Sequence, residues 1–168
     1  MGQGTRMAVS VCLFAAVLAA CTGKKTTVST PGGNVTVEQG PNGQSTTTIK
    51  SGQGEVKFGK GAVDPASIGL PLYPGATQSD EGSMSLSHSA NGEGGQVLVM
   101  TTGDDFDKVY DFYRSQMPAG SEKLKMSSGG SQMASFQVGD TGAKDSKSVV
   151  IRASNGKVTI ELLRSTKD

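Results

Sequence analysis

The sequence predicts an α+β fold, in which a small antiparallel sheet is covered by one helix and preceded by a polar, β-rich spacer. Two observations come from the C-terminal part of the chain. Several segments between residues 83 and 164 alternate apolar and polar residues with the period of a strand, and residues 104–118 carry the period of a helix. The third observation is that residues 22–60 are rich in Gly, Ser and Thr and contain few large apolar residues.

Residues 22–60 contain four short alternating runs, TTVS, NVTVEQ, STTTIK and EVKFGK. The turn sequences PGGN, GPNGQ and SGQG separate them. The spacing of about ten or eleven residues is a weak internal repeat. Two interpretations stay open at this stage, because small hairpins without a hydrophobic face are marginally stable in water. The segment is either a meander of short strands or a flexible polar tether.

The folded domain is predicted to begin at residue 61, where Pro65, Pro71 and Pro74 stiffen the chain and apolar residues return. About a hundred residues follow, enough for one modest core. Residues 83–89, SMSLSHS, alternate strictly, which places Met84, Leu86 and His88 on one face of a half-buried strand. Residues 96–102 form a second strand, joined to the first through the turn sequence NGEGG.

The predicted helix begins after Asp104, which is suited to the N-cap, and Asp107 is placed as a short capping-box acid. Pro118 ends it. Its apolar stripe consists of Phe106, Val109, Tyr110, Tyr113 and Met117.

Four more strands are predicted after the helix, in EKLKMSS, QMASFQVG, KSVVIRAS and KVTIELLR. The last two are joined by Asn155-Gly156, a favoured two-residue type I′ turn. Closing the hairpin there gives three apolar pairs on one face: Ala153 with Val158, Ile151 with Ile160, and Val149 with Leu162. A slip of one residue would set that face against polar neighbours, so the pattern predicts the register.

The N-terminus has the three parts of an export signal: Arg6 near the start, an apolar run from about Met7 to Leu18, and small residues before Cys21. The run is about a dozen residues, shorter than the roughly 20 of a membrane-spanning helix. Leu18-Ala19-Ala20-Cys21 resembles the lipobox of bacterial lipoproteins. The resemblance implies cleavage between Ala20 and Cys21 and a diacylglycerol on the Cys21 thiol. It also implies a location in the cell envelope, on the periplasmic face of the outer membrane in a bacterium with two membranes.

The chain is thus expected to consist of a signal peptide (1–20), a lipidated N-terminus with the spacer (21–60) and an α+β domain (61–168). Cys12 leaves with the signal, so the mature chain has no second cysteine for a disulfide. The formal net charge of +1 gives no strong attraction to nucleic acid. The expected membrane partner is lipid, through the acylated Cys21, and no cofactor is predicted.

The sequence leaves two alternative functions open, a small hydrolase and a copper-binding protein. His88 is the only histidine, so a small hydrolase would have to use it. Copper(I) would be bound by thioethers together with His88, and five methionines are available: Met84, Met100, Met117, Met126 and Met133. Asp104, Asp105 and Asp107 lack the spacing of an EF-hand and are expected to serve the helix N-terminus. We therefore expect a non-enzymatic binding or structural domain, with no catalytic residue and no metal site.

Two further motifs are Leu70-Pro71-Leu72-Tyr73-Pro74-Gly75-Ala76 and the helix segment from Asp105 to Arg114, with Val109 and Phe112-Tyr113-Arg114. Together they resemble a group of uncharacterised bacterial envelope lipoproteins that share an LP-x-YPGA motif and a D-x-x-x-V-x-x-FYR helix. The resemblance implies no activity. Tyr73, Phe112 and Arg114 are the candidate interface for an envelope protein partner. In the alternative, Phe112 packs beneath the loop near Tyr73.

Overall fold

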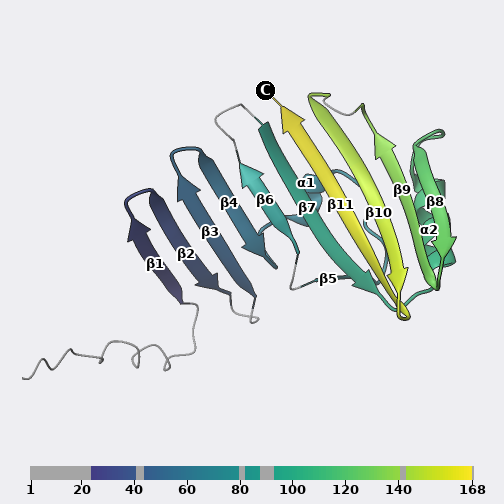
Figure 1. Ribbon diagram of the computed structural model, residues 1–168, viewed down its shortest axis with the longest axis horizontal. Coiled ribbons are helices and arrows are strands. Elements are labelled where there is room, and N and C mark those ends of the chain that lie inside the picture. Colours follow the sequence, from purple (N-terminus) through teal and green to yellow (C-terminus); the bar gives the residue numbers. More distant parts are fainter. Residues whose placement is uncertain (1–23, 41–43, 80–81, 88–92, 141–142, 168) are drawn as a thin grey trace, which may run out of the picture.

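The computed structural model describes residues 24–40, 44–79, 82–87, 93–140 and 143–167. Ala20, Cys21 and His88, which the sequence analysis singled out, lie outside these residues. The described residues form one antiparallel sheet of 11 strands and two helices (Figure 1). The strand order is β1-β2-β3-β4-β6-β7-β11-β10-β9-β8, and β5 pairs with β7 beside β6.

In chain order the elements are β1 (Lys25–Thr30), β2 (Gly33–Gln39), β3 (Ser45–Ser51), β4 (Gly54–Gly59), α1 (Pro65–Ile68), β5 (Thr77–Gln78), β6 (Met84–Ser87), β7 (Glu93–Thr102), α2 (Phe106–Gln116), β8 (Glu122–Ser128), β9 (Ser131–Val138), β10 (Asp145–Ser154) and β11 (Lys157–Lys167).

The predicted fold class is wrong, because the sheet is neither small nor confined to the C-terminal part. The four alternating runs of the spacer are strands β1 to β4, and β4 pairs with β6 through Val56↔Leu86 and Phe58↔Met84. The molecule is therefore dominated by one continuous sheet. Period-2 patterns reveal each strand, but the hydrogen bonds that join two strands come from the backbone and leave no such pattern. A second helix, α1, was also missed.

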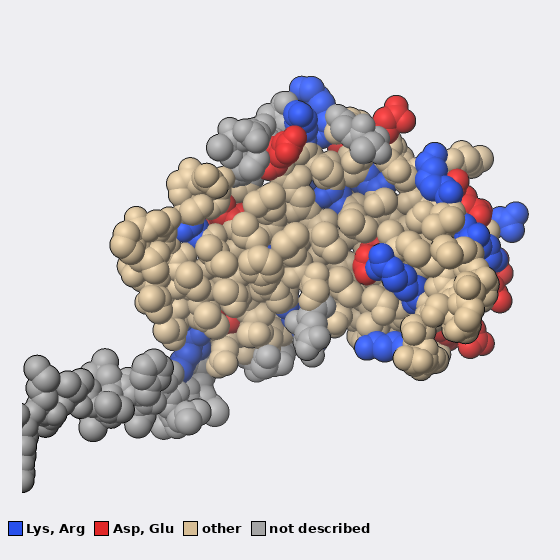
Figure 2. All heavy atoms as spheres, viewed as in Figure 1, with Lys and Arg blue, Asp and Glu red and all other residues tan. Residues whose placement is uncertain are grey.

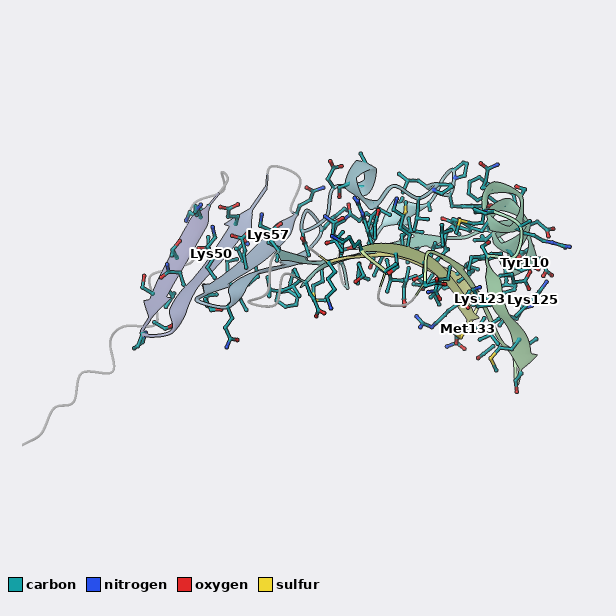
Figure 3. The ribbon with its side chains drawn as sticks, turned by 90° about the horizontal axis from the view of Figure 1, so that it is seen from above. Lys50, Lys57, Tyr110, Lys123, Lys125 and Met133 are labelled. Carbon is teal, nitrogen blue, oxygen red and sulfur yellow. The ribbon has the colours of Figure 1, made fainter. Side chains whose placement is uncertain are left out.

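Both helices lie on the same side of the sheet, over its C-terminal half, whereas β1–β4 have no helix on either side (Figure 3). We call β1–β4 the N-terminal extension. Every fully buried apolar side chain of the described residues lies at residue 62 or beyond. The cluster joins α1, α2 and strands β7, β9, β10 and β11, and its most deeply buried large side chains include Tyr113, Phe136, Ile68, Leu98 and Ile160. The predicted stripe of α2 is confirmed, since all five of its residues are buried.

The predicted register of the last hairpin is confirmed. Ala153 pairs with Val158, Ile151 with Ile160 and Val149 with Leu162. Asn155 and Gly156 both have positive φ, at 53° and 72°, as a type I′ turn requires.

Strand β6 has the predicted alternation, but its faces are reversed. Ser85 is 8% exposed and points to the helix-covered side. It pairs with Gln96 of β7, and Gln96 lies on the same face of β7 as the buried Leu98, two residues further along the strand. Met84 and Leu86 point to the other side, which we call the open face of the sheet. The open face continues across the extension as a row of aliphatic side chains in register: Leu86, Val56, Ile49, Val35 and Val28.

Helix α1 begins with Asp64 as its N-cap, whose Oδ1 accepts a hydrogen bond from the Ala66 N–H at 3.0 Å. Pro65 occupies the first turn and Gly69 ends the helix at φ 64°. The Arg164 guanidinium of β11 donates to the Ser67 carbonyl at 2.8 Å and to both carboxylate oxygens of Asp145 at 3.0 and 3.2 Å. This arginine fastens α1 to the sheet.

Candidate functional site

A surface depression of about 400 Å³ lies where the loop after α1 meets helix α2. Tyr73 of that loop is 5% exposed and packs edge-on against Phe112 of α2, with ring centroids 5.2 Å apart and planes at 86°. The depression is lined by Tyr73, Pro74, Asp104, Lys108, Asp111, Phe112 and Ser115. Its aromatic floor and charged rim combine the two features by which concave sites hold a ligand.

Asp104 organises the rim of this depression. Its Oδ2 accepts a hydrogen bond from the Tyr73 hydroxyl at 2.7 Å and lies 3.0 Å from the Lys108 Nζ. The hydrogen bond from Tyr73, together with Lys108, lowers the pKa of the Asp104 carboxyl. Burial, and then the Asp104 carboxylate, raise the pKa of Tyr73 to about 12. Tyr73 therefore stays protonated at neutral pH and serves as a hydrogen-bond donor.

The cap of α2 differs from the prediction by one residue. Asp105, with extended backbone at φ −66° and ψ 151°, is the N-cap, and its side chain makes no capping hydrogen bond. Asp104 is used for the contact with Tyr73 and Lys108 instead. A tertiary hydrogen bond thus replaces the local one, which a sequence pattern for capping cannot anticipate.

The structure brings together two of the three predicted interface residues. Tyr73 and Phe112 are in contact, and Phe112 packs against the core, as the alternative interpretation expected. Arg114 is exposed and does not line the depression. Because residues three and four apart share a helix face, the lining residues Lys108, Asp111, Phe112 and Ser115 follow one face, and Arg114 lies away from it.

Sequence reasoning missed Asp104, Lys108, Asp111 and Ser115 as members of the site. Their spacing of three and four residues was present in the sequence, but polar residues at that spacing are found on every solvated helix face. Only the contact of Tyr73 with Phe112 shows which face of α2 lines the depression. Tyr113, whose ring packs edge-on against Phe112, is fully buried, and this burial raises the pKa of its hydroxyl.

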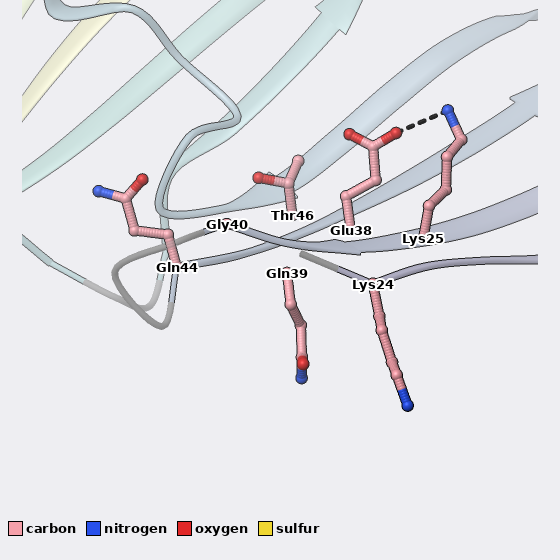
Figure 4. A pocket seen from close by; sticks show the side chains of 7 residues that line it. All are labelled: Lys24, Lys25, Glu38, Gln39, Gly40, Gln44 and Thr46. Carbon is pink, nitrogen blue, oxygen red and sulfur yellow. Dashed lines mark ion pairs between the residues drawn. The ribbon is translucent and has the colours of Figure 1, made fainter. Parts of the chain in front are cut away.

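A second depression, of about 280 Å³, lies at the end of the extension (Figure 4). Lys25 and Glu38 form an ion pair there at 2.7 Å. Figure 4 shows that Lys25, Glu38 and Thr46 point to one side of the sheet, whereas Lys24 and Gln39 point to the other. The lining residues thus belong to two faces and do not converge on one ligand.

The five methionines of the copper alternative do not come together. Met100 and Met117 are buried in the core under the helices. Met126 and Met133 pair with each other on the open face, and Met84 lies on that face in β6, several strands away. Asp107 lies 3.7 Å from Lys125. Within the described part of the chain, no cluster of three or more His, Cys, Asp or Glu is arranged to hold a metal ion.

Comparison with known proteins gives one match. The model of the START domain-like family matches residues 81–165, just over half of the 168-residue chain. No match was found among curated proteins or among solved structures. Among the described residues, neither helix has the length and hydropathy to cross a membrane.

The matched segment runs from the start of β6 into β11 and includes α2. START-like folds have a helix-grip arrangement, and here the sheet packs against α2 through β9 and β10. The match indicates a small ligand-binding domain. The chain belongs to the START domain-like family.

Proposed function

We propose that this protein is a bacterial envelope lipoprotein, anchored by acylated Cys21, whose START-like domain binds another envelope protein and performs no catalysis. The observation that carries the anchoring is the position of the lipobox. Leu18-Ala19-Ala20-Cys21 ends only three residues before β1, so the lipid would be attached directly to the edge of the folded sheet. Two acyl chains on one cysteine suffice for stable membrane attachment.

The depression at Tyr73 and Phe112 is the proposed binding site. The depression has a volume of about 400 Å³ and can receive a projecting side chain of a protein partner. Aromatic side chains at the floor supply contact area, and Lys108 and Asp111 at the rim supply polar contacts. The hydrogen bond from Tyr73 to Asp104 holds the floor in place before a partner arrives.

The anchor is tested by intact-mass measurement of protein from the membrane fraction. We expect loss of residues 1–20 and the added mass of a diacylglycerol on Cys21. The variant Cys21→Ser should lose the modification, and Cys12→Ser, which changes a residue of the signal, is the matched control and should retain it. An unmodified Cys21 in the wild-type membrane fraction would contradict the proposal.

The binding site is tested by placing a photo-crosslinking amino acid at Ser115 in one variant and at Arg114 in another. Both residues are exposed near the end of α2, but only Ser115 lines the depression. We expect a cross-linked envelope protein from position 115 and little or none from position 114. Equal cross-linking at both positions, or none at 115, would contradict the assignment of the depression.

A further inference from the structure

The open face of the N-terminal extension carries large apolar side chains that nothing in the described structure covers. Val28, Val37, Ile49 and Phe58 are 57%, 38%, 41% and 40% exposed. The strand registers place all four on the open face: Val28 pairs with Val35, which pairs with Ile49, and Val37 and Phe58 both pair with Thr47. Exposed apolar patches of this kind commonly mark a contact surface.

Charge is divided unequally between the two faces of the extension. Lys25, Glu38, Lys50, Glu55 and Lys57 all point to the side on which the helices lie, where they form ion pairs. Among the described residues of β1–β4, the open face carries no charged side chain. Figure 2 shows the open face, and its N-terminal end consists mostly of uncharged residues. This face can therefore leave water without the large cost of dehydrating a charge.

The short distance in sequence between β1 and Cys21 indicates what this face would contact. Three residues, Thr22 to Lys24, separate the lipobox cysteine from β1, and an extended chain of that length reaches about 10 Å. Lys24 itself points to the open-face side (Figure 4), where its ammonium group can reach anionic headgroups. An acyl anchor at Cys21 would thus hold the extension within a few side-chain lengths of the bilayer surface.

We propose that the open face of the extension lies on the bilayer, with Val28, Val37, Ile49 and Phe58 in contact with lipid. This inference rests on the acylation of Cys21 stated above. The backbone N–H and C=O groups of the inner strands are hydrogen-bonded to the neighbouring strands from β1 to β6. The open face can therefore approach lipid without bringing unpaired backbone groups of these strands into it. The polar face, with its ion pairs, stays in water.

The size of the patch favours a lipid surface over a second copy of the chain. Five strands, β1 to β4 and β6, with two rows of side chains cover roughly 300 Å², from strand spacings of about 4.8 Å and residue spacings of about 3.3 Å. A stable protein interface buries about 800 Å² per partner. A tethered face needs less area, because the anchor makes contact with the membrane an intramolecular event at high effective concentration.

The test uses two reporters in neighbouring residues of β4. The sequence contains no tryptophan, so Phe58→Trp and Lys57→Trp each provide a single fluorophore, the first on the open face and the second on the polar face. The full acylated protein is reconstituted into vesicles that contain lipids brominated on their acyl chains. We expect quenching of the F58W reporter to be several-fold stronger than that of K57W. Ile49→Trp, on the same open face, is a second reporter should F58W fold poorly.

Two outcomes would overturn the inference and leave the proposed function standing. In the first, the protein is acylated and bound to vesicles, yet the open-face and polar-face reporters are quenched equally weakly. In the second, open-face reporter emission shifts to the blue without quenching, and the shift depends on protein density, which would identify a second copy as the occupant. Loss of vesicle binding with an unmodified Cys21 would instead contradict the proposed function, and the inference with it.

Discussion

The N-terminal extension and the helix-covered half of this sheet are made from the same kind of strand under opposite conditions. In β11, Ile160 is fully buried in the core on the helix-covered side of the sheet, whereas in β3, Ile49 is 41% exposed. Both halves are held by continuous backbone pairing from β1 to β8. Backbone hydrogen bonds between strands are thus enough to extend the sheet. A hydrophobic core forms only in the part of the sheet on which the helices pack.

The family match covers only part of this division. It begins at residue 81, so β1–β4 lie outside it, and so do α1 and β5 of the helix-covered half. The match thus covers α2 and strands β6 to β11, while Ile68 of α1 and Tyr73 of the following loop complete the core from outside the matched segment. The predicted boundary at residue 61 stays a prediction, because backbone pairing crosses it while the apolar core does not.

The largest expected difference between the halves is the cost of truncating an isoleucine. Ile160→Ala should lower the free energy of unfolding by about 2–5 kcal/mol, because it removes packed methylenes and leaves a cavity. Ile49→Ala is the matched control and should cost less than about 1 kcal/mol in protein free of lipid vesicles. Equilibrium denaturation of the purified variants measures both. Similar losses would show that the open face is already covered in the isolated protein.

Removing an arginine should also cost more stability on the helix-covered side of the sheet than on the open face. Arg164→Ala removes the hydrogen bond that fastens α1 through the Ser67 carbonyl and should cost about 1–2 kcal/mol. Arg152 forms an ion pair with Glu161 on the open face, and Arg152→Ala should cost no more than about 1 kcal/mol, as for exposed pairs. Thermal and chemical unfolding of both variants makes the comparison. A larger loss for Arg152 would contradict the role given to α1.

Tyr73→Phe should have a smaller effect, about 1 kcal/mol, because it removes one hydrogen bond to a partly exposed carboxylate and keeps the ring against Phe112. Binding at the depression should weaken as well if Asp104 needs this bond to hold its position. Denaturation and the cross-linking yield at Ser115 are the two measurements. Unchanged stability together with unchanged cross-linking would show that the hydrogen bond does not organise the site.

The same variant has a defined pH dependence. The fold raises the pKa of Tyr73 from 10 to about 12, so the folded state favours the neutral phenol. The stabilisation from this shift is complete below pH 10 and is lost as the pH rises towards 12. The stability advantage of wild type over Tyr73→Phe should therefore shrink between pH 10 and pH 12. An advantage that stays constant over this range would contradict the shift.

Deletion of residues 22–60 should have the smallest effect on the remaining domain. The extension contributes backbone pairing to β6 but no fully buried apolar side chain, so a chain starting near Ala62 should unfold cooperatively with a midpoint close to that of residues 22–168. Circular dichroism during thermal unfolding measures the midpoint. A molten or insoluble fragment would show that the edge of β6 depends on β4.

Part of the candidate site could be predicted from the sequence. Tyr73 and Phe112 stood out as aromatic residues beside short motifs, and their contact is present. Asp104 was assigned to the helix cap, and its contacts with Tyr73 and Lys108 were missed, because Tyr73 is 31 residues away in the chain. A side-chain hydrogen bond over that separation leaves no periodic signal.

By itself, the sequence determined the local elements. Alternation identified β6, β7 and the four last strands, and it offered β1 to β4 beside the alternative of a flexible tether. The apolar stripe identified α2, and Asn155-Gly156 determined the register of the final hairpin. Each of these rests on neighbours within a few residues, where backbone geometry links side-chain spacing to structure. Helix α1 had a local signal too, in the N-cap Asp64, Pro65 and Gly69.

Only the tertiary structure decided that these strands form one sheet and which of its faces is covered. In β6, Met84 and Leu86 would be placed in the core by their hydrophobicity, yet both helices pack on the side of Ser85. Alternation separates two faces but does not say which one a helix covers, because that choice depends on where the distant segments α1 and α2 cross the sheet. The aliphatic face left open by this choice includes β1, which begins four residues after the predicted lipid anchor Cys21 in the sequence.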